Sequence, residues 1–178
     1  MMDEEVYELN PVTRITVGAI GRPGSRVFYL QASQGEQTIS LKLEKQQVYA
    51  LAQGADQILE ELEQREVRPM SGLEEPSSGD LDIQEPVEPV FVAGQIGLAY
   101  DPESSMIVVI VEELSLEEEP SAVARLWASP GQMRALSRHA YEIVASGRPI
   151  CPLCQRPIDP DGHFCPRSNG HSTEAVEY

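Results

Sequence analysis

Two stretches of this chain align with each other without gaps, and this internal match constrains the fold more than any other feature. Residues 40–59 match residues 125–144. The identical pairs are Leu41 with Leu126, Gln47 with Gln132, Ala50 with Ala135, Leu51 with Leu136, Ala55 with Ala140 and Ile58 with Ile143. Apolar residues recur in both stretches at the spacing of one helix face, so we expect two amphipathic helices. The pair Ser129-Pro130 is typical of the start of the second helix.

Short segments with the two-residue period of strands precede each expected helix. They are residues 14–18, 26–31 and 37–42 in the first half, and residues 90–94, 105–111 and 122–126 in the second half. The sequences Gly18-Ala-Ile-Gly21 and Gly94-Gln-Ile-Gly97 are typical of the turns between the first two strands of each half. The pattern predicts an α+β fold built from a duplicated strand-strand-strand-helix unit. It would have a mainly antiparallel sheet of about six strands, with two helices on one face.

The prediction divides the chain into two such units, a linker and a tail. Residues 1–65 hold the first unit, residues 66–89 an acidic, proline-rich linker, residues 90–148 the second unit, which forms one domain with the first, and residues 149–178 the tail.

Residues 71–90 carry acidic side chains, three prolines and no base, which is typical of a mobile linker. Loop length changes stability only logarithmically, so deleting Glu74 to Asp82 should barely change the melting temperature. A second acidic stretch, residues 112–119, is expected to end a strand and form a hairpin loop.

Composition narrows the class of protein. The chain has 178 residues, 41% of them hydrophobic, which suits one soluble domain with an appendage. It contains no apolar run long enough to cross a bilayer and no secretory signal pattern, so we expect a cytoplasmic protein without a membrane partner. The net charge of −16 repels phosphate backbones, so free nucleic acid is not an expected ligand.

A cluster of cysteine and histidine near the end of the chain predicts a metal site. Cys151 and Cys154 have the spacing with which two thiolates bind one zinc ion, and His163 and Cys165 can return to the same ion after a turn-rich connector. His171 competes with His163 as the fourth ligand; we favour His163 because it lies beside Cys165. Since four protein ligands close a tetrahedral site, the expected zinc is structural.

Other candidate residues carry weaker signals. Arg22 and Arg26 lie near a glycine-rich turn of an acidic protein and can contact an anion. The turn lacks the Lys-Ser or Lys-Thr of a phosphate loop. His139 is expected on the exposed side of the second helix, three residues before Glu142, a pairing that is more often a solvated contact than a catalytic one. We predict no catalytic residue.

Four segments together resemble one bacterial protein family. They are VGAIGRPGSRVFYLQA, LEKQQVYALA, AGQIGLAYDPE and RPICPLCQRPIDPDGHFCPRSNGH, the last of which fits the pattern CPxCxxPxDPxGHxCPRxNG. From Thr13 to His171 the chain resembles the family known as domain of unknown function 3090, although its acidic linker is longer than expected for that family. The resemblance implies a cytosolic, zinc-carrying protein whose gene lies beside genes for a histidine phosphatase and a lipid-kinase-like protein. It implies no activity and does not choose between the two histidines.

These features favour a non-catalytic, zinc-binding interaction or adaptor protein that binds another protein of a phosphate-linked pathway. The alternative is an enzyme or regulator that binds a small phosphorylated or thiol metabolite in the cleft between the two repeats, with Arg22 or Arg26 as anion contacts. An open sheet also has an edge strand that can pair with a second copy, so a homodimer is a further option.

Overall fold

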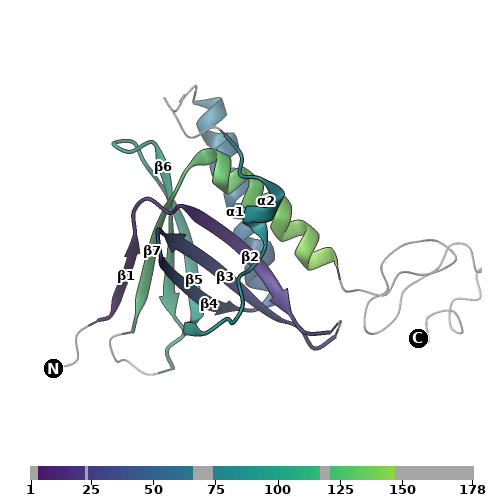
Figure 1. Ribbon diagram of the computed structural model, residues 1–178. Coiled ribbons are helices and arrows are strands. Elements are labelled where there is room, and N and C mark those ends of the chain that lie inside the picture. The colour runs from purple at the N-terminus through teal and green to yellow at the C-terminus, as the bar shows by residue number, and fades with distance from the viewer. Residues whose placement is uncertain (1–3, 23, 66–73, 117–120, 147–178) are drawn as a thin grey trace, which may run out of the picture.

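A computed structural model describes residues 4–22, 24–65, 74–116 and 121–146 of the chain (Figure 1). The strands are β1 (Val6–Leu9), β2 (Arg14–Ile20), β3 (Val27–Gln34), β4 (Gln37–Leu43), β5 (Pro89–Asp101), β6 (Met106–Glu113) and β7 (Val123–Ala128). The helices are α1 (Lys45–Gln64), the short 3-10 helix η1 (Ser78–Leu81) and α2 (Pro130–Ala145). None of the helices in these ranges is long and apolar enough to cross a membrane.

The strands form one mixed sheet in the order β1-β7-β6-β5-β4-β3-β2. Strands β2, β3 and β4 form an antiparallel meander, as do β5, β6 and β7. The β4–β5 and β7–β1 pairings are parallel, and we call them the two seams. The α+β class, the two helices and all six expected strands are therefore confirmed, whereas the sheet has seven strands and is mixed. Strand β1 was missed because it has only four residues, three of which are not buried.

The sheet curls so that its two edge strands approach each other. Strands β1 and β2 are the two edges, and only residues 10–13 separate them along the chain. Within this connection the Val12 amide donates to the Trp127 carbonyl of β7 at 2.8 Å, and the Thr13 amide donates to the Ser33 carbonyl of β3 at 2.7 Å. The short connection thus ties the two ends of the sheet together.

The core lies on the inner face of the curl. Helices α1 and α2 pack on each other and against the sheet, α1 mainly on β5 and α2 mainly on β2 (Figure 1). The largest buried apolar side chains from the strands and helices are Leu9, Val17, Leu30, Leu41, Ile107, Val109, Leu126, Val48, Leu51, Met133 and Leu136. Their burial supplies most of the driving force for closing the helices over the sheet.

The predicted turn at Gly94-Gln-Ile-Gly97 is wrong. These residues lie inside β5, which runs on to Asp101, and the register of β5 shifts between Ala93 and Ile96. Gly18 likewise lies inside β2. Glycine is common both in turns and at irregular positions within strands, so the sequence does not distinguish the two. In β5, Gly94 lies at the register shift and not in a turn.

The prediction of a mobile linker is also wrong for residues 74–88, which we call the strap. The Thr16 hydroxyl of β2 donates to the Leu81 carbonyl at 2.5 Å, and a terminal nitrogen of Arg14 donates to the Asp82 carbonyl at 3.0 Å. Ile83 packs so closely on β2 that a Cβ atom at Gly18 would lie 2.9 Å from the Ile83 Cβ.

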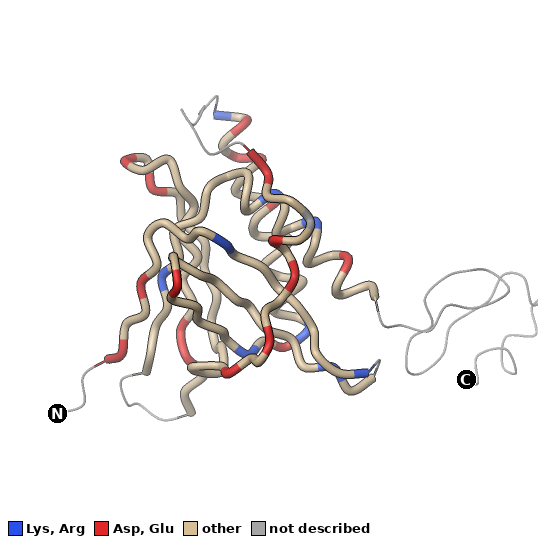
Figure 2. Tube along the Cα trace, viewed as in Figure 1, with Lys and Arg blue, Asp and Glu red and all other residues tan. Residues whose placement is uncertain are grey.

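The strap also satisfies a polar side chain that lies inside the protein. The buried Gln31 of β3 accepts from the Gln84 amide at 2.8 Å and donates to the Gln84 carbonyl at 3.0 Å. The same amide group donates to Ser40 at 3.1 Å. A row of polar side chains on the outer face of the first half is thus covered by the acidic strap, whose charges Figure 2 places along its course.

Candidate functional site

Helix α1 begins with a glutamine that binds a strand of the other half. The Gln47 side-chain oxygen accepts from the Glu44 amide at 2.7 Å, which closes the first turn of the helix. Its amide nitrogen donates to the carbonyls of Ala93 and Gly94 at 3.1 and 2.7 Å. These carbonyls lie where the register of β5 shifts, so Gln47 supplies donors where the ladder is interrupted.

Helix α2 begins in the same way. The Gln132 side-chain oxygen accepts from the Ser129 amide at 2.8 Å, and the Ser129 hydroxyl accepts from the Gln132 amide at 3.1 Å, so the predicted helix start is confirmed. The Gln132 amide nitrogen reaches the carbonyls of Val12 and Thr13 at 3.3 and 3.4 Å. The two glutamines that align in sequence therefore make equivalent contacts, each to the chain segment of the opposite half.

The two seams share a register as well. Leu41 of β4 pairs with Phe91 of β5, and Leu126 of β7 pairs with Leu9 of β1. Leu41 and Leu126 are an aligned pair in the sequence. At one seam β5 of the second half pairs with β4, the strand before α1. At the other seam β1 of the first half pairs with β7, the strand before α2.

A groove opens between α1 of the first half and β5 of the second, where the cleft between the two repeats was expected. It encloses about 310 Å³ and is lined by Ala50, Leu51, Gly54, Gln57, Ile58, Glu61, Ile96 and Leu98. We call it the α1–β5 groove. A Cβ atom at Gly54 would lie 3.0 Å from Leu98 Cδ1, so the absence of a side chain at Gly54 gives the groove its depth. Its lining is mostly apolar, with Glu61 as its charged member, and it contains neither predicted anion contact.

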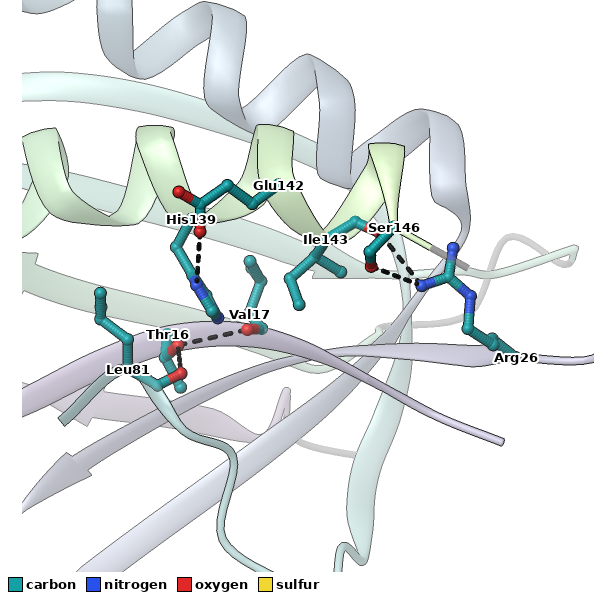
Figure 3. Close-up of polar contacts among 8 residues, drawn as sticks. All are labelled: Thr16, Val17, Arg26, Leu81, His139, Glu142, Ile143 and Ser146. Carbon is teal, nitrogen blue, oxygen red and sulfur yellow. Dashed lines mark hydrogen bonds and ion pairs between the residues drawn. The ribbon is translucent and has the colours of Figure 1, made fainter. Parts of the chain in front are cut away.

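The corresponding place between α2 and β2 is filled. His139, which aligns with Gly54, lies between α2 and β2 beside Thr16 and Leu81 (Figure 3). Its side chain is only 17% exposed, so the expectation of an exposed histidine was wrong. Its Nδ1 lies 3.8 Å from a carboxylate oxygen of Glu142. The imidazole fills the space beside the strap, and Glu142, its predicted partner, lies close to it.

Arg26 holds the end of α2. One of its terminal nitrogens donates to the Ile143 carbonyl and to the Ser146 hydroxyl, both at 3.1 Å (Figure 3). Its guanidinium carbon lies 5.0 Å from the centre of the Phe28 ring. A cation at the carboxyl end of a helix satisfies free carbonyls and opposes the helix dipole. Arg22, the other predicted anion contact, lies exposed in the β2–β3 turn.

A polar cluster that the sequence analysis did not find joins the two helices. Asp56 of α1 accepts hydrogen bonds from the Ser137 and Tyr141 hydroxyls of α2, the latter at 3.0 Å. Burial, reinforced by the carboxylate of Asp56, raises the pKa of Tyr141, and the Tyr49 ring packs edge-on against it at 5.6 Å. Asp56 is 81 residues from Ser137 and 85 residues from Tyr141, and the three form no sequence motif. The cluster is therefore visible only in the packing of the two helices.

The predicted zinc ligands Cys151, Cys154, His163 and Cys165, and the competing His171, lie outside the described residues. The described chain ends at Ser146, one residue after α2, and Arg26 donates a hydrogen bond to the Ser146 hydroxyl.

The described residues form an α+β protein in which two helices close a curled mixed sheet and an apolar groove lies between α1 and β5. The chain belongs to the family described as protein of unknown function (DUF3090), whose family model matches residues 7–165. No curated protein and no solved structure matches the chain. The matched range includes His163 and Cys165 and ends before His171.

Proposed function

We propose that this protein is a non-catalytic, zinc-binding interaction protein that presents its tail to another protein, as an adaptor in a phosphate-signalling or phosphoryl-transfer pathway. The ligands are Cys151, Cys154, His163 and Cys165, around one structural zinc ion. The observation that carries the proposal is the extent of the family match, which runs from β1 to Cys165 and so treats sheet, helices and tail as one unit.

The end of α2 supports this arrangement. Arg26 binds Ile143 and Ser146, so the last described residue is held by a contact from the β2–β3 hairpin. Ser146, the residue to which the tail is joined, is therefore held against the β2–β3 hairpin. A zinc-bound tail anchored in this way loses less conformational entropy on binding a partner than a free peptide does.

We also propose that the two halves are copies of one strand-strand-strand-helix unit. The equivalent contacts of Gln47 and Gln132 and the equivalent registers of the two seams support this proposal. Under this proposal β1 and β2 together correspond to the single strand β5, interrupted by residues 10–13. An adaptor built in this way offers two related surfaces to its partners.

Native mass spectrometry of the tagged chain, purified from its own host, tests the adaptor function. The expected result is one zinc ion per chain and one partner protein in fixed stoichiometry, both retained under native conditions. The matched control is Cys154→Ser, which should lose the zinc and the partner together. A partner that stays bound to the zinc-free variant would contradict the role of the tail.

The alternative function, binding of a small metabolite, has one supporting observation. The α1–β5 groove lies between the two halves and has a volume at the lower end of the range of small-molecule sites. Its lining favours an apolar or thiol compound over a phosphorylated one, because Glu61 repels phosphate and Arg26 is bound to α2. A thermal-shift screen with thiol and phosphorylated metabolites tests this function, since binding to the native state raises the melting temperature.

A further inference from the structure

We propose that the free edge of β1 binds an extended segment of another protein, in which basic side chains alternate with apolar ones. The segment adds to the sheet as a further strand beside β1. This surface is separate from the tail, so the proposal goes beyond the zinc-dependent adaptor function. It follows from the backbone groups that β1 presents at the edge of the sheet and from the charges around them.

The two edges of the sheet differ in how they are covered (Figure 1). Strand β2 is largely buried, and both α2 and the strap pack on it. In β1, three of the four residues are not buried, and Val6 is 47% exposed. An open strand edge presents N–H and C=O groups that another strand can bind. Among the described residues, β1 is therefore the accessible edge of the sheet.

The pairing of β1 with β7 determines which backbone groups point to the free edge. The Val123 amide donates to the Glu5 carbonyl at 2.9 Å, and Val6 is the register partner of Val123. In a parallel ladder, alternate residues of a strand bond to the same neighbour, so the backbone groups of Glu5 and Tyr7 face β7. Those of Val6 and Glu8 point the other way, where no described strand lies.

The next residue in this alternation, Asn10, has its backbone groups satisfied. The Asn10 amide donates to the Gln34 side-chain oxygen at 3.2 Å, and the Asn10 carbonyl accepts from the Gln34 side-chain nitrogen at 3.1 Å. The carboxamide of Gln34 thus binds both backbone groups of Asn10, as a neighbouring strand would. It closes this end of the edge, so an added strand pairs with Val6 and Glu8 and stops at Gln34.

The charges around β1 determine the kind of segment that fits. Glu4, Glu5 and Glu8 are exposed, and β1 and the two residues before it contain no base. The hydrogen bond from the Tyr7 hydroxyl to Glu5, together with burial and nearby carboxylate charge, raises the pKa of Tyr7, as expected where the potential is negative. Arg125 of β7 pairs with Glu8 at 3.0 Å and offsets one charge. Basic side chains complement the remaining ones.

The strand geometry divides these requirements between two faces. Val6 and Glu8 lie on the outer face of the sheet, whereas Tyr7 lies on the inner face, where its ring centre is 6.1 Å from that of Phe91. The segment therefore carries lysine or arginine on the outer face, where the aliphatic stem covers Val6 and the charge approaches Glu8. Its apolar side chains lie on the inner face beside Tyr7. A second copy of β1 brings further carboxylates to the edge and does not meet this requirement.

Amide hydrogen exchange in the full chain, followed by NMR, tests the addition of a strand. The probe is a short synthetic peptide in which lysine alternates with valine. At a saturating peptide concentration, exchange of the Val6 and Glu8 amides should slow by about tenfold or more, because the new hydrogen bonds protect them. The amide of Gly24, in the exposed β2–β3 turn, is the internal control and should be unaffected.

Two methylated peptides separate strand addition from adsorption by charge alone. One is N-methylated on its lysines and the other on its valines. Only one of these two sets of amides faces β1 in an added strand, so one peptide should lose binding and the other should retain it. Fluorescence anisotropy of dye-labelled peptides measures both.

A charge reversal tests the predicted chemistry of the segment. Glu8→Lys should weaken binding of the lysine–valine peptide about tenfold, because it removes the carboxylate that faces the lysines. The matched control is Glu60→Lys, which makes the same change in net charge at an exposed position of α1 and should leave binding unchanged. Melting temperatures establish that both variants fold.

Several outcomes overturn the proposal. They are unchanged exchange at Val6 and Glu8 with the peptide, equal binding of the two methylated peptides, and equal binding of a peptide that alternates glutamate with valine. Slow exchange of both amides in the protein alone also overturns it. If that protection depends on protein concentration, a second copy occupies the edge, and otherwise another part of the same chain does. None of these readouts involves zinc, so they leave the adaptor function to its own test.

Discussion

Asp101 and Trp127 connect the β5–β6 turn to β7. One carboxylate oxygen of Asp101 accepts from the Glu103 amide at 3.0 Å, and the other accepts from the Ser104 hydroxyl at 2.8 Å and from the Trp127 indole at 3.3 Å. The Ser104 hydrogen bond, joined by those from Glu103 and Trp127, lowers the pKa of Asp101 below its usual range. Hydrogen bonds of this kind favour the charged carboxylate.

The lowered pKa of Asp101 predicts an acid-dependent loss of stability. Ionised Asp101 stabilises the fold above the pKa that it has in the unfolded chain, and this contribution disappears as the pH falls through the lower folded pKa. The melting temperature of Asp101→Asn should therefore fall below that of the unmodified protein at neutral pH and approach it in acid. Trp127 is the only tryptophan, so its fluorescence should report the titration of Asp101.

The control for this prediction is the fluorescence of Asp101→Asn, which should show no transition in that acid range. A difference in melting temperature that stays constant from neutral to acid pH would contradict the prediction.

The predicted zinc site has its own test at the scale of single residues. Cys154→Ser should release the zinc ion while α1 and α2 stay formed, because the two helices are held by a core of described residues that runs from Leu9 to Ala140. His163→Ala should lower zinc occupancy, and its matched control His171→Ala should retain it, in line with a family match that ends at Cys165. Metal content is measured by elemental analysis and helix content by circular dichroism.

Retained zinc in Cys154→Ser would remove that residue from the ligand set. Loss of zinc in His171→Ala, with full occupancy in His163→Ala, would reverse the choice of histidine.

At the scale of elements, the glutamines that begin the helices are predicted to stabilise the contact between the halves. Gln47→Ala removes the hydrogen bonds to Ala93 and Gly94, and Gln132→Ala those to Val12 and Thr13. Gln47→Ala should lower the free energy of unfolding by about 1–3 kcal/mol, because it leaves two partly buried carbonyls without donors. Gln132→Ala should have a smaller effect, because its hydrogen bonds are longer and that to Thr13 is exposed.

Chemical denaturation measures this loss, and Gln46→Ala is the matched control, since Gln46 is exposed on the same helix turn. Equal stability of Gln46→Ala and Gln47→Ala would show that the hydrogen bonds to β5 contribute nothing.

The sequence predicts elements well where a periodic pattern is long enough to stand out. Both helices and six strands follow from apolar spacing, and the alignment of Gln47 with Gln132 matches two side chains that make equivalent contacts. Strand β1 is too short to show a period, and the irregularity of β5 near Gly94 looks like a turn. Both errors concern places where pairing with a distant strand, and not local preference, determines the backbone.

At the scale of the whole molecule, the strap is predicted to stabilise the first half. Gly18→Val should lower the free energy of unfolding by about 1–3 kcal/mol, because its side chain would collide with Ile83 and displace the strap. The matched control is Gly97→Val, at a position in β5 where a Cβ atom has no neighbour within 4 Å. Thermal unfolding measures both variants, and an equal effect would return residues 74–88 to the status of a passive linker.

The packing of the strap and the role of Arg26 could not be predicted from the sequence. Thr16 and Leu81 are 65 residues apart, and Arg26 and Ile143 are 117 residues apart. Residues 71–90 are acidic and rich in proline. This composition is compatible with a mobile linker, and equally with a segment that packs on the sheet and whose carbonyls accept hydrogen bonds from buried side chains. The candidate zinc ligands, by contrast, form a local pattern and can be proposed without any knowledge of the fold.

The parallel seam between β1 and β7 bears on how this chain reaches its native state. Residues Val6 to Leu9 pair with Val123 to Leu126, so β1 can pair only after the chain has been synthesised as far as β7. Contacts between such distant segments close large loops and slow folding. Until β7 arrives, the early strands carry an unsatisfied edge, and this interval is when a newly made molecule is most exposed to aggregation.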